Sequence, residues 1–258
     1  RDYAFAGLAF GAVLLIKSSA ALFPPLLFLA LWITQRTWPA FRHAFGRVFV
    51  FGIAAVALSV PWIWRNYEVS HAFVPTMTNG GLAAFQGVYV VKHWDSGREH
   101  YALIDEADAE QEAIAKQMGL RYKSGFFQTF YTPQDEIAFY DRLGALAKQQ
   151  FKDDPGLLVR AVLFNLRGFW IQGRTARATL MNTIVVAPFL ALVLAGSWVA
   201  WRRRLPVAVL LLFSLGFMAA HLPIIGVARY HVPVIPPLTI ILALAALPLL
   251  GPVDHRRN

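Results

Sequence analysis

The chain is 258 residues long, and 57% of its residues are hydrophobic while only 15% are charged. An ordinary soluble domain has roughly 25% charged residues, so this composition excludes one and indicates a chain that lies largely in lipid. The net charge of +9 is of the kind seen in nucleic-acid-binding domains, and the absence of cysteine excludes disulfides and thiolate metal sites. The chain begins at Arg1 without a signal peptide, so we expect it to be a piece of a longer protein.

The N-terminal apolar region, Tyr3–Thr34, is interrupted by the short polar sequence Lys17–Ser19. A single helix over this region would be about 46 Å long, which exceeds the roughly 30 Å hydrocarbon core of a bilayer. A charge in the middle of a membrane is costly, whereas a lysine at the interface is not. The sequence therefore predicts two short membrane spans that meet at Lys17.

Four further apolar runs contain no Asp, Glu, Lys or Arg and are long enough to cross a membrane. They are Val48–Trp64, Met181–Trp201, Leu205–Leu222 and Val232–Val253. We therefore predict an all-α polytopic membrane protein with about six transmembrane helices. Residues 1–64 contain the first three helices and an inner loop at 35–47, and residues 181–258 contain the last three and an inner tail. A helical outer segment, residues 65–180, separates the third helix from the fourth.

The predicted outer segment is electrically neutral, with 13 Lys or Arg and 13 Asp or Glu. Its first part is expected to be a loop, because Asn79-Gly80-Gly81 is a strong turn signal. Apolar spacing then predicts three helices, over Glu106–Met118, from Pro133 to Phe151 and from Pro155 to Trp170. The last two begin with residue pairs typical of a helix start, Thr132-Pro133 and Asp154-Pro155, in which the first residue is the N-cap.

The positive charge is concentrated in three short segments. Residues 35–47, the loop around Arg202–Arg204 and the C-terminal tail hold eight basic residues and one acid. By the positive-inside rule these three segments are cytoplasmic, which places the Lys17 region, residues 65–180 and Pro223–His231 on the opposite face. The excess of positive charge is therefore a topology signal, and nucleic acid is not a predicted partner.

No metal site or cofactor is predicted. The acidic run Asp105–Glu112 is interpreted as a solvated helix face with acids near its N-terminus. His93, Asp95, Glu99 and His100 lie close together in sequence, but their spacing matches no known metal cage. The chain contains no GxGxxG, P-loop or Gly-x-Ser-x-Gly motif, so the common nucleotide and nucleophile motifs are absent.

Three cations that are far apart in sequence fall at the outer ends of predicted membrane segments: Lys17, Arg65 and Arg229. Cations at a membrane surface can make short charge-assisted hydrogen bonds to a phosphate in a low dielectric. The alternative for each one is a snorkelling anchor. We hypothesise that all three form one phosphate site. In the same regions, Pro61–Tyr67 is typical of an aromatic belt, and His231 is expected to be a hydrogen-bonded interfacial histidine rather than a proton shuttle.

These residues also resemble a known family. The sequences Pro61–Tyr67, Phe73–Pro75 and Thr78–Gly81 resemble the middle of bacterial GT-C glycosyltransferases, the protein-mannosyltransferase-like or aminoarabinose-transferase-like enzymes of glycosyltransferase family 39. Arg229–Pro233 resembles their Arg-Tyr-x-x-Pro motif before the last helix. Lys17–Ser19 is similar to their Thr-Lys/Arg-x-Thr step, although Ile16 stands where the family has its first Thr. Phe151–Trp170 resembles the segment that leads back to the membrane.

The resemblance implies a multi-pass enzyme of the bacterial inner membrane with a long periplasmic loop. Such an enzyme transfers a sugar from a polyprenyl-phosphate carrier to a lipid, glycan or protein acceptor on the outer face. Its general-base carboxylate lies in the first outer loop, which is expected before Arg1, so the fragment is expected to be inactive alone. Carrier-phosphate binding is assigned to Lys17, Arg65 and Arg229. The residues expected to shape the substrate site are Asn66, Tyr67, Asn79, Gly80, Gly81, Tyr230 and His231.

Three other functions remain open from the sequence. A transporter or flippase subunit for a lipid-linked substrate would place charged groups along a path at membrane depth. Here the membrane runs are nearly free of ionisable residues and the cations gather on one predicted face, which favours an interfacial enzyme. A GT-C-like ligase or polymerase would also use Arg and His in its outer loops. A purely structural membrane protein is less consistent with the large capped outer segment.

Overall fold

The computed structural model describes residues 1–34, 37–94, 100–121, 130–203, 205, 207–226 and 228–246. Helices joined by loops make up these residues, and no strand occurs among them. The elements in chain order are α1 (Asp2–Ile16), the 3₁₀ helix η1 (Ser18–Leu22), α2 (Phe23–Thr34), α3 (Trp38–Ser70), α4 (Gly80–Lys92), α5 (His100–Gln117), α6 (Pro133–Asp153), α7 (Gly156–Trp170), α8 (Ala176–Arg202), α9 (Ala208–His221), the 3₁₀ helix η3 (Ala228–Val234) and α10 (Ile235–Ala246).

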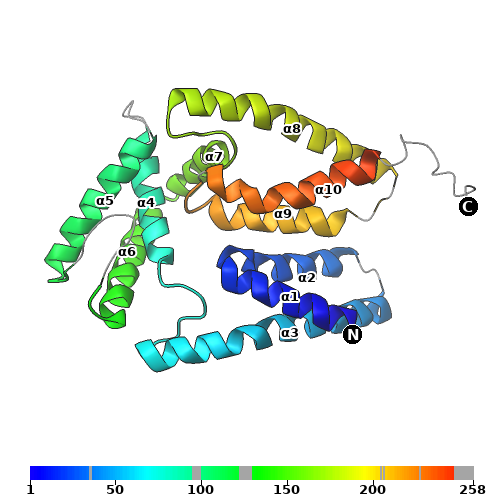
Figure 1. Ribbon diagram of the computed structural model, residues 1–258, viewed down its shortest axis with the longest axis horizontal. Helices are drawn as coiled ribbons and strands as arrows, with labels where there is room; N and C mark the ends of the chain where they lie inside the picture. The colour runs from blue at the N-terminus through cyan, green and yellow to red at the C-terminus, as the bar shows by residue number, and fades with distance from the viewer. Residues whose placement is uncertain are drawn as a thin grey trace, which may run out of the picture.

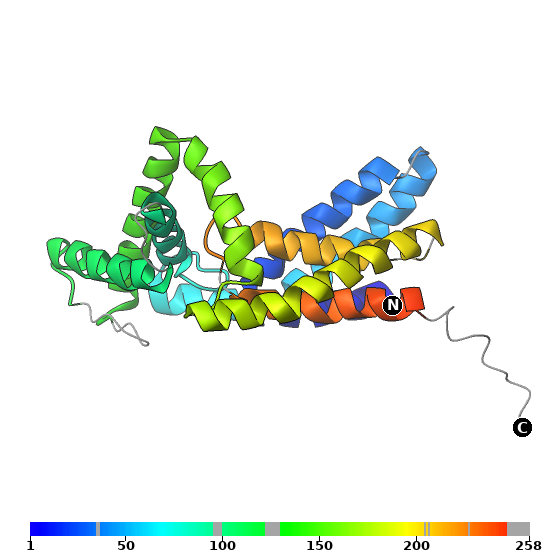
Figure 2. The same ribbon diagram turned by 90° about the horizontal axis from the view of Figure 1, so that it is seen from above.

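The long apolar helices form a bundle with a group of shorter helices at one end. Figure 1 shows α1, α2 and α3 on one side of the bundle and α8, α9 and α10 on the other, with α4, α5 and α6 beyond one end. The view from above agrees with this placement (Figure 2). Consecutive apolar helices run in opposite directions, so the ends of α1, α3 and α9 and the starts of α2, α8 and α10 lie at the end that faces α4–α6 (Figure 1). We call this the capped end of the bundle.

Helices α1 and α3 pack closely because two glycines of α1 lie four residues apart. Gly7 and Gly11 are buried, and a Cβ atom on either would overlap backbone of α3, at the carbonyl oxygens of Phe51 and Ala55. Small residues at this spacing allow helix backbones to approach in an apolar environment, where van der Waals packing is the main attraction. This Gly-x-x-x-Gly contact explains how α1 is held although it is short.

The interruption at Lys17 separates two helices, as the sequence predicts. Helix α1 ends at Ile16, and Lys17 has extended backbone angles of φ −144° and ψ 91°. The chain then turns through η1 into α2. The expected division of Tyr3–Thr34 into two helices is therefore confirmed.

Two helices in the described part of the chain are long and apolar enough to cross a membrane, α3 with 33 residues and α8 with 27. In the most apolar 18-residue stretch of each helix, only 17% (α3) and 22% (α8) of the residues are buried inside the protein. Val56 on α3 and Leu194 on α8, for example, are 57% and 73% exposed. A soluble monomer rarely presents such continuous apolar surface to water, and a helix in lipid does so as a rule.

The other apolar helices are shorter than the hydrocarbon core. They are Asp2–Ile16, Ser18–Trp32, Ala208–His221 and Tyr230–Ala246. The 15 residues of α1 span about 22 Å, against the roughly 30 Å needed. The last part of the predicted run Val232–Val253 and the whole C-terminal tail lie outside the described residues. Six membrane spans therefore remain a prediction.

Helix α3 begins well before the predicted apolar run. It starts at Trp38, so Arg42 and Arg47, which were expected in an inner loop, are helical. The helix also continues to Ser70, six residues past the expected end at Trp64, and ends at His71 with a left-handed φ of 52°. At about 50 Å the helix is longer than a bilayer core, so both of its charged ends can extend beyond the apolar layer.

The three helices predicted in residues 65–180 are present. Helix α5 covers Glu106–Gln117 but begins earlier, at His100. Helix α6 begins at Pro133, and the Thr132 side chain accepts a hydrogen bond from the Asp135 N–H at 3.1 Å, which confirms Thr132 as the N-cap. Asp154 is not the cap of α7, because the helix begins one residue later at Gly156 after Pro155, and the Asp154 carboxylate forms an ion pair with Arg160.

One helix was missed. Gly80 and Gly81 were expected to form a turn in a loop, but they begin the 13-residue helix α4. A Cβ atom on Gly81 would overlap the backbone carbonyl of Tyr140 on α6, whereas a Cβ on Gly80 would meet nothing within 4 Å. Gly81 is therefore required by the close approach of two helices and not by a turn. A glycine pair is typical both of a tight turn and of a close helix contact, so the local sequence alone does not tell which of the two it forms.

Candidate functional site

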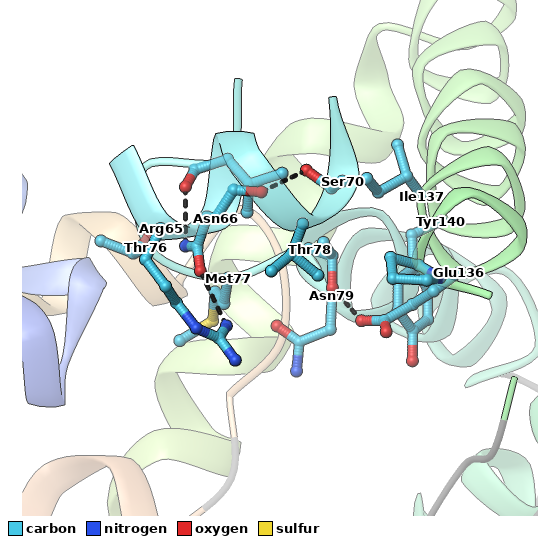
Figure 3. Close-up of a pocket in the computed structure, with 13 residues that line it drawn as sticks. Arg65, Asn66, Ser70, Thr76, Met77, Thr78, Asn79, Glu136, Ile137 and Tyr140 are labelled. Carbon is cyan, nitrogen blue, oxygen red and sulfur yellow. Dashed lines mark hydrogen bonds between the residues drawn. The ribbon is translucent and has the colours of Figure 1, made fainter. Parts of the chain in front are cut away.

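A polar pocket of about 520 Å³ lies at the capped end of the bundle, where α3 ends and meets the start of α4 and of α6. Its polar lining residues come from three separate segments of the chain and are labelled in Figure 3. They are Arg65, Asn66, Ser70, Thr76, Thr78, Asn79, Glu136 and Tyr140. Val69, Val74, Met77, Pro133 and Ile137 complete the wall. We call this the α3 pocket.

Asn66 fixes both the Arg65 side chain and the loop that follows α3. The Asn66 side chain is only 8% exposed. Its Nδ2 donates to the carbonyl oxygen of Val74 at 2.9 Å, and its Oδ1 accepts a hydrogen bond from the Arg65 guanidinium at 3.3 Å. The guanidinium also lies 5.4 Å from the centre of the Trp62 ring, within the range of a cation–π contact. Arg65 is therefore held beside the pocket by its own helix.

The loop between α3 and α4 is tied to both neighbours. The Ser70 hydroxyl donates to the Asn66 carbonyl oxygen at 2.7 Å and accepts from the Ala72 N–H at 3.2 Å. The Gln134 side chain of α6 donates to the Ser70 carbonyl oxygen at 3.2 Å. The last carbonyl groups of a helix have no hydrogen-bond partner within the helix, and these bonds supply partners at the end of α3. Hydrogen bonds therefore hold the loop that forms this wall of the pocket in place.

The opposite wall of the α3 pocket contains a carboxylate. The Thr78 hydroxyl donates a hydrogen bond to the carboxylate of Glu136, which lies 58 residues later in the sequence. Burial, together with the negative charge of Glu136, raises the pKa of the Tyr140 phenol to about 12. Figure 3 shows Arg65, Asn79 and Glu136 directed to the same side of the pocket. A ligand there would meet a cation at one end and hydrogen-bonding amide, carboxylate and phenol groups at the other.

A second group of predicted residues meets at η3, at the same end of the bundle. The Lys17 Nζ lies 4.5 Å from the centre of the Tyr230 ring, which in turn contacts the His221 ring at 4.6 Å between centroids. The sequence places Lys17 and Tyr230 more than two hundred residues apart, and the fold brings the start of η1 and η3 together.

His231 is engaged by α7. Its Nδ1–H donates to the Phe169 carbonyl oxygen at 2.9 Å, and its ring stacks on Trp170 at 5.5 Å between centroids. The hydrogen-bonded histidine that the sequence predicts is therefore observed. The side chain of Arg229 lies outside the described residues, so its part in a three-cation site remains a prediction.

The structure separates the predicted site residues into these two groups. Arg65, Asn66 and Asn79 line the α3 pocket. Tyr230 and His231 belong to η3, and Lys17 contacts the Tyr230 ring. Tyr67 is 50% exposed and does not line the pocket. Gly80 and Gly81 belong to α4, where Gly81 serves packing rather than a sugar-binding loop.

Sequence reasoning missed Glu136 and Tyr140. The one available signal is their spacing of four residues, which places them on the same face of α6. The contact of Glu136 with Thr78 is long-range and has no local signature.

A different long-range contact fixes the shorter helices to the bundle. Asn165 on α7 is 1% exposed, and its side chain donates to the Leu222 carbonyl oxygen and accepts from the Gly226 N–H, both at 2.9 Å. A Cβ atom on Gly168 or on Gly87 would overlap backbone of the same 222–226 segment. The loop after α9 is thereby clamped between α4 and α7, close to η3.

Of the four residues considered as metal ligands, Asp95 and Glu99 lie outside the described residues. Within the described residues no group of three or more acids and histidines could hold a metal ion. His93 instead hydrogen-bonds to its own helix, where its Nδ1–H donates to the Tyr89 carbonyl oxygen at 2.8 Å. Comparisons of the chain with protein-family models, with curated proteins and with solved structures found no match.

Proposed function

We propose that this chain is part of a membrane glycosyltransferase of the GT-C type and that it binds the phosphate of a polyprenyl-phosphate sugar carrier. The observation that carries the proposal is the α3 pocket, in which Arg65 is held by Asn66 at the end of a helix long enough to span a membrane. A carrier lipid has its chain in the bilayer and its phosphate at the interface, which is where this pocket would lie if α3 crosses the membrane.

The proposal includes the six-span topology. In it, α1, η1 with α2, α3, α8, α9 and α10 cross the membrane of a bacterial cell, and α4–α7 form the cap on the outer face. The alternating direction of the helices is consistent with this topology, since the predicted outer segments gather at the capped end (Figure 1). The shorter helices would need local thinning of the bilayer or flanking residues that reach the interface, both of which carry a modest cost.

Four polar residues of the α3 pocket have direct roles in the proposal. Arg65 would form charge-assisted hydrogen bonds to the carrier phosphate and offset the negative charge that grows on it as its bond to the sugar breaks. Asn79, Glu136 and Tyr140 would form hydrogen bonds with sugar hydroxyls, in which the carboxylate accepts and the amide and phenol can donate or accept. Lys17 and Arg229, at the η1–η3 contact, would attract the same phosphate or a neighbouring one.

A binding measurement tests this function. The 258-residue chain, purified in an uncharged detergent, is titrated with undecaprenyl phosphate and with uncharged undecaprenol, and the bound lipid is counted by native mass spectrometry. We expect saturable binding of the phosphate lipid and little binding of the alcohol. The Arg65→Gln variant should bind the phosphate lipid about tenfold more weakly, which is the effect of losing one charge-assisted hydrogen bond.

The matched control is Arg42→Gln, which removes the same charge from an exposed position near the opposite end of the same helix. Its affinity should stay within twofold of the original chain. Equal binding of the lipid phosphate and the alcohol, or equal losses in the two variants, would rule out a phosphate site at Arg65 and with it this proposal.

A further inference from the structure

A second cavity, of about 570 Å³, lies where α5, α7 and the start of α8 meet. Its lining includes Trp94, His100, Arg167, Gln172 and Arg174, and it shares no residue with the α3 pocket. We call it the α8 pocket. Nothing in the proposed glycosyltransferase function uses it.

The α8 pocket contains buried polar atoms that have no hydrogen-bond partner in the part of the chain that the structure describes. His100 is only 4% exposed, and neither of its ring nitrogens has a partner among the described residues. The Gln172 Oε1 is also buried, and no described side chain or backbone group hydrogen-bonds to it. Because buried polar groups in native proteins are nearly always paired, such atoms on one cavity wall point to a bound group that completes them.

The His100 ring is held in place by apolar contacts. It stacks on Phe164 at 5.2 Å and 25° and meets the Tyr101 ring edge-on at 5.3 Å. Burial lowers the pKa of the His100 imidazole to about 4. At neutral pH the ring is therefore uncharged, with one nitrogen able to donate a hydrogen bond and the other able to accept one.

The charge of the α8 pocket favours an anion. Arg167 and Arg174 line it, and no Asp or Glu is among its described lining residues. Helix α8 begins at Ala176 on the same wall, and the positive end of a helix dipole attracts anions. Thr175, the N-cap, satisfies one of the free N–H groups of this turn, that of Ala178, at 3.1 Å.

The wall continues along α8 towards its apolar length. Thr179, Leu180 and Thr183 belong to the lining, and Leu180 is 60% exposed. Because α8 is long and apolar enough to span a membrane, a ligand in this pocket can have a polar head at the arginines and an apolar part beside α8.

We propose that the α8 pocket is a binding site for a phosphate monoester, held by Arg167 and Arg174. The ring N–H of the neutral His100 donates to a phosphate oxygen, and the Gln172 Oε1 accepts from the P–OH of the singly protonated phosphate. The group can come from a lipid headgroup or from a free phosphate, and the chemistry of recognition is the same. The site does not depend on glycosyl transfer, so it stands or falls separately from the α3 pocket.

Histidine NMR gives a direct readout. The full chain is labelled with ¹³C-histidine in an uncharged detergent, and the His100 signal is identified by its loss in the His100→Gln variant. Dihexanoyl phosphatidic acid, dihexanoyl phosphatidylcholine and inorganic phosphate are titrated separately. We expect phosphatidic acid to shift the His100 signal saturably, with affinity at least tenfold higher than phosphatidylcholine, in which the phosphate is a diester with a single charge.

The two phosphate arms identify the source of the ligand. If inorganic phosphate shifts the same signal as strongly as phosphatidic acid, the phosphate group alone is the ligand, and if only phosphatidic acid does so, the ligand is a lipid. Both results support the site. If none of the three probes moves the His100 signal, the proposal is overturned.

Exposed arginines provide variants that keep the fold. Arg167→Gln and Arg174→Gln should each weaken phosphatidic acid binding about tenfold. Arg160→Gln on α7 and Arg177→Gln on α8 remove the same charge from exposed positions that do not line the pocket, and they should change affinity less than twofold. Equal losses in all four variants would show diffuse attraction to a basic surface and would contradict a built site.

Discussion

At the scale of single residues, burial acts on two ionisable groups of the cap helices in opposite directions. His100 on α5 and Tyr140 on α6 are both buried. Burial disfavours the charged form of any group, so it lowers the pKa of the histidine to about 4 and raises that of the tyrosine to about 12. Both side chains are therefore neutral at pH 7, and each lines a pocket as a hydrogen-bonding group rather than as a charge.

The lowered pKa of His100 makes stability depend on pH. Between its usual pKa of 6.5 and the folded value of about 4, the unfolded chain binds a proton at His100 and the folded chain does not. The free energy of unfolding should therefore fall as the pH drops through this window, by about 3 kcal/mol in total, and it should be unaffected by His100 above pH 7. Thermal unfolding of the chain in detergent at pH 7.5 and pH 4.5 measures most of this loss.

Comparison with two variants isolates the effect of His100. In His100→Gln the loss between the two pH values should be smaller by about 2.5 kcal/mol, because pH 4.5 lies about two units below the unfolded pKa. In His43→Gln, which changes an exposed histidine on α3, the loss should match the original chain. An identical pH dependence in the original chain and in His100→Gln would contradict the prediction.

At the scale of helices, the contact between α4 and α6 positions two walls of the α3 pocket, the segment that leads into α4 and the start of α6. Gly81 on α4 faces the Tyr140 carbonyl, and Gly144 on α6 lies close to the Gly81 Cα, so the two helices approach nearly backbone to backbone. This approach brings Thr78, just before α4, to Glu136 on α6. The pocket therefore depends on two glycines that carry no functional group.

We expect Gly81→Ala to separate α4 from α6. The added Cβ would overlap a backbone carbonyl, which has no flexible end to move aside, so the cost should be about 2 to 3 kcal/mol. If the substitution lowers the free energy of local unfolding of α4 by this amount, hydrogen exchange of the α4 amides in the full chain should be faster by roughly thirtyfold or more. Gly80→Ala adds the same methyl group in open space, so its exchange should be unchanged or slower. Similar rates in the two variants would show that the helices are not in tight contact.

The same contact shows what local sequence can and cannot predict. The start of α6 at Thr132 was predictable because a cap and a proline at the first helical position act within one turn. The break at Lys17 was predictable because a charge inside a long apolar run has few tolerable places. Helix α4 was not, since Gly80-Gly81 is equally typical of a turn and of a helix that packs closely. The α3 pocket was predicted only on its α3 side, because Glu136 and Tyr140 join it through a fold that places distant segments together.

At the scale of the whole molecule, the described chain combines two environments. The α4–α7 helices have buried cores of ordinary soluble type, such as Phe139, Leu143 and Ile114. The bundle helices instead keep much of their apolar surface exposed. Polar pockets occur where the two parts meet, at the end of α3 and at the start of α8. Both sites thus lie where a membrane lipid would present its headgroup to the cap if α3 and α8 cross the bilayer.

The absence of cysteine makes this arrangement directly testable. Single cysteines at Tyr131 in the cap region and at Thr37 and Arg203, which are exposed at the opposite end of the bundle, report location without background labelling. If α3 and α8 cross the membrane, a membrane-impermeant maleimide added to sealed vesicles should label position 131 from one side only. It should label positions 37 and 203 only from the other side, and detergent should make all three reactive.

If position 131 reacts from the same side as position 37, α3 does not cross the bilayer. If position 131 reacts from the same side as position 203, α8 does not cross it. The α3 pocket could then not receive a lipid phosphate from the bilayer in the way that the proposed function requires.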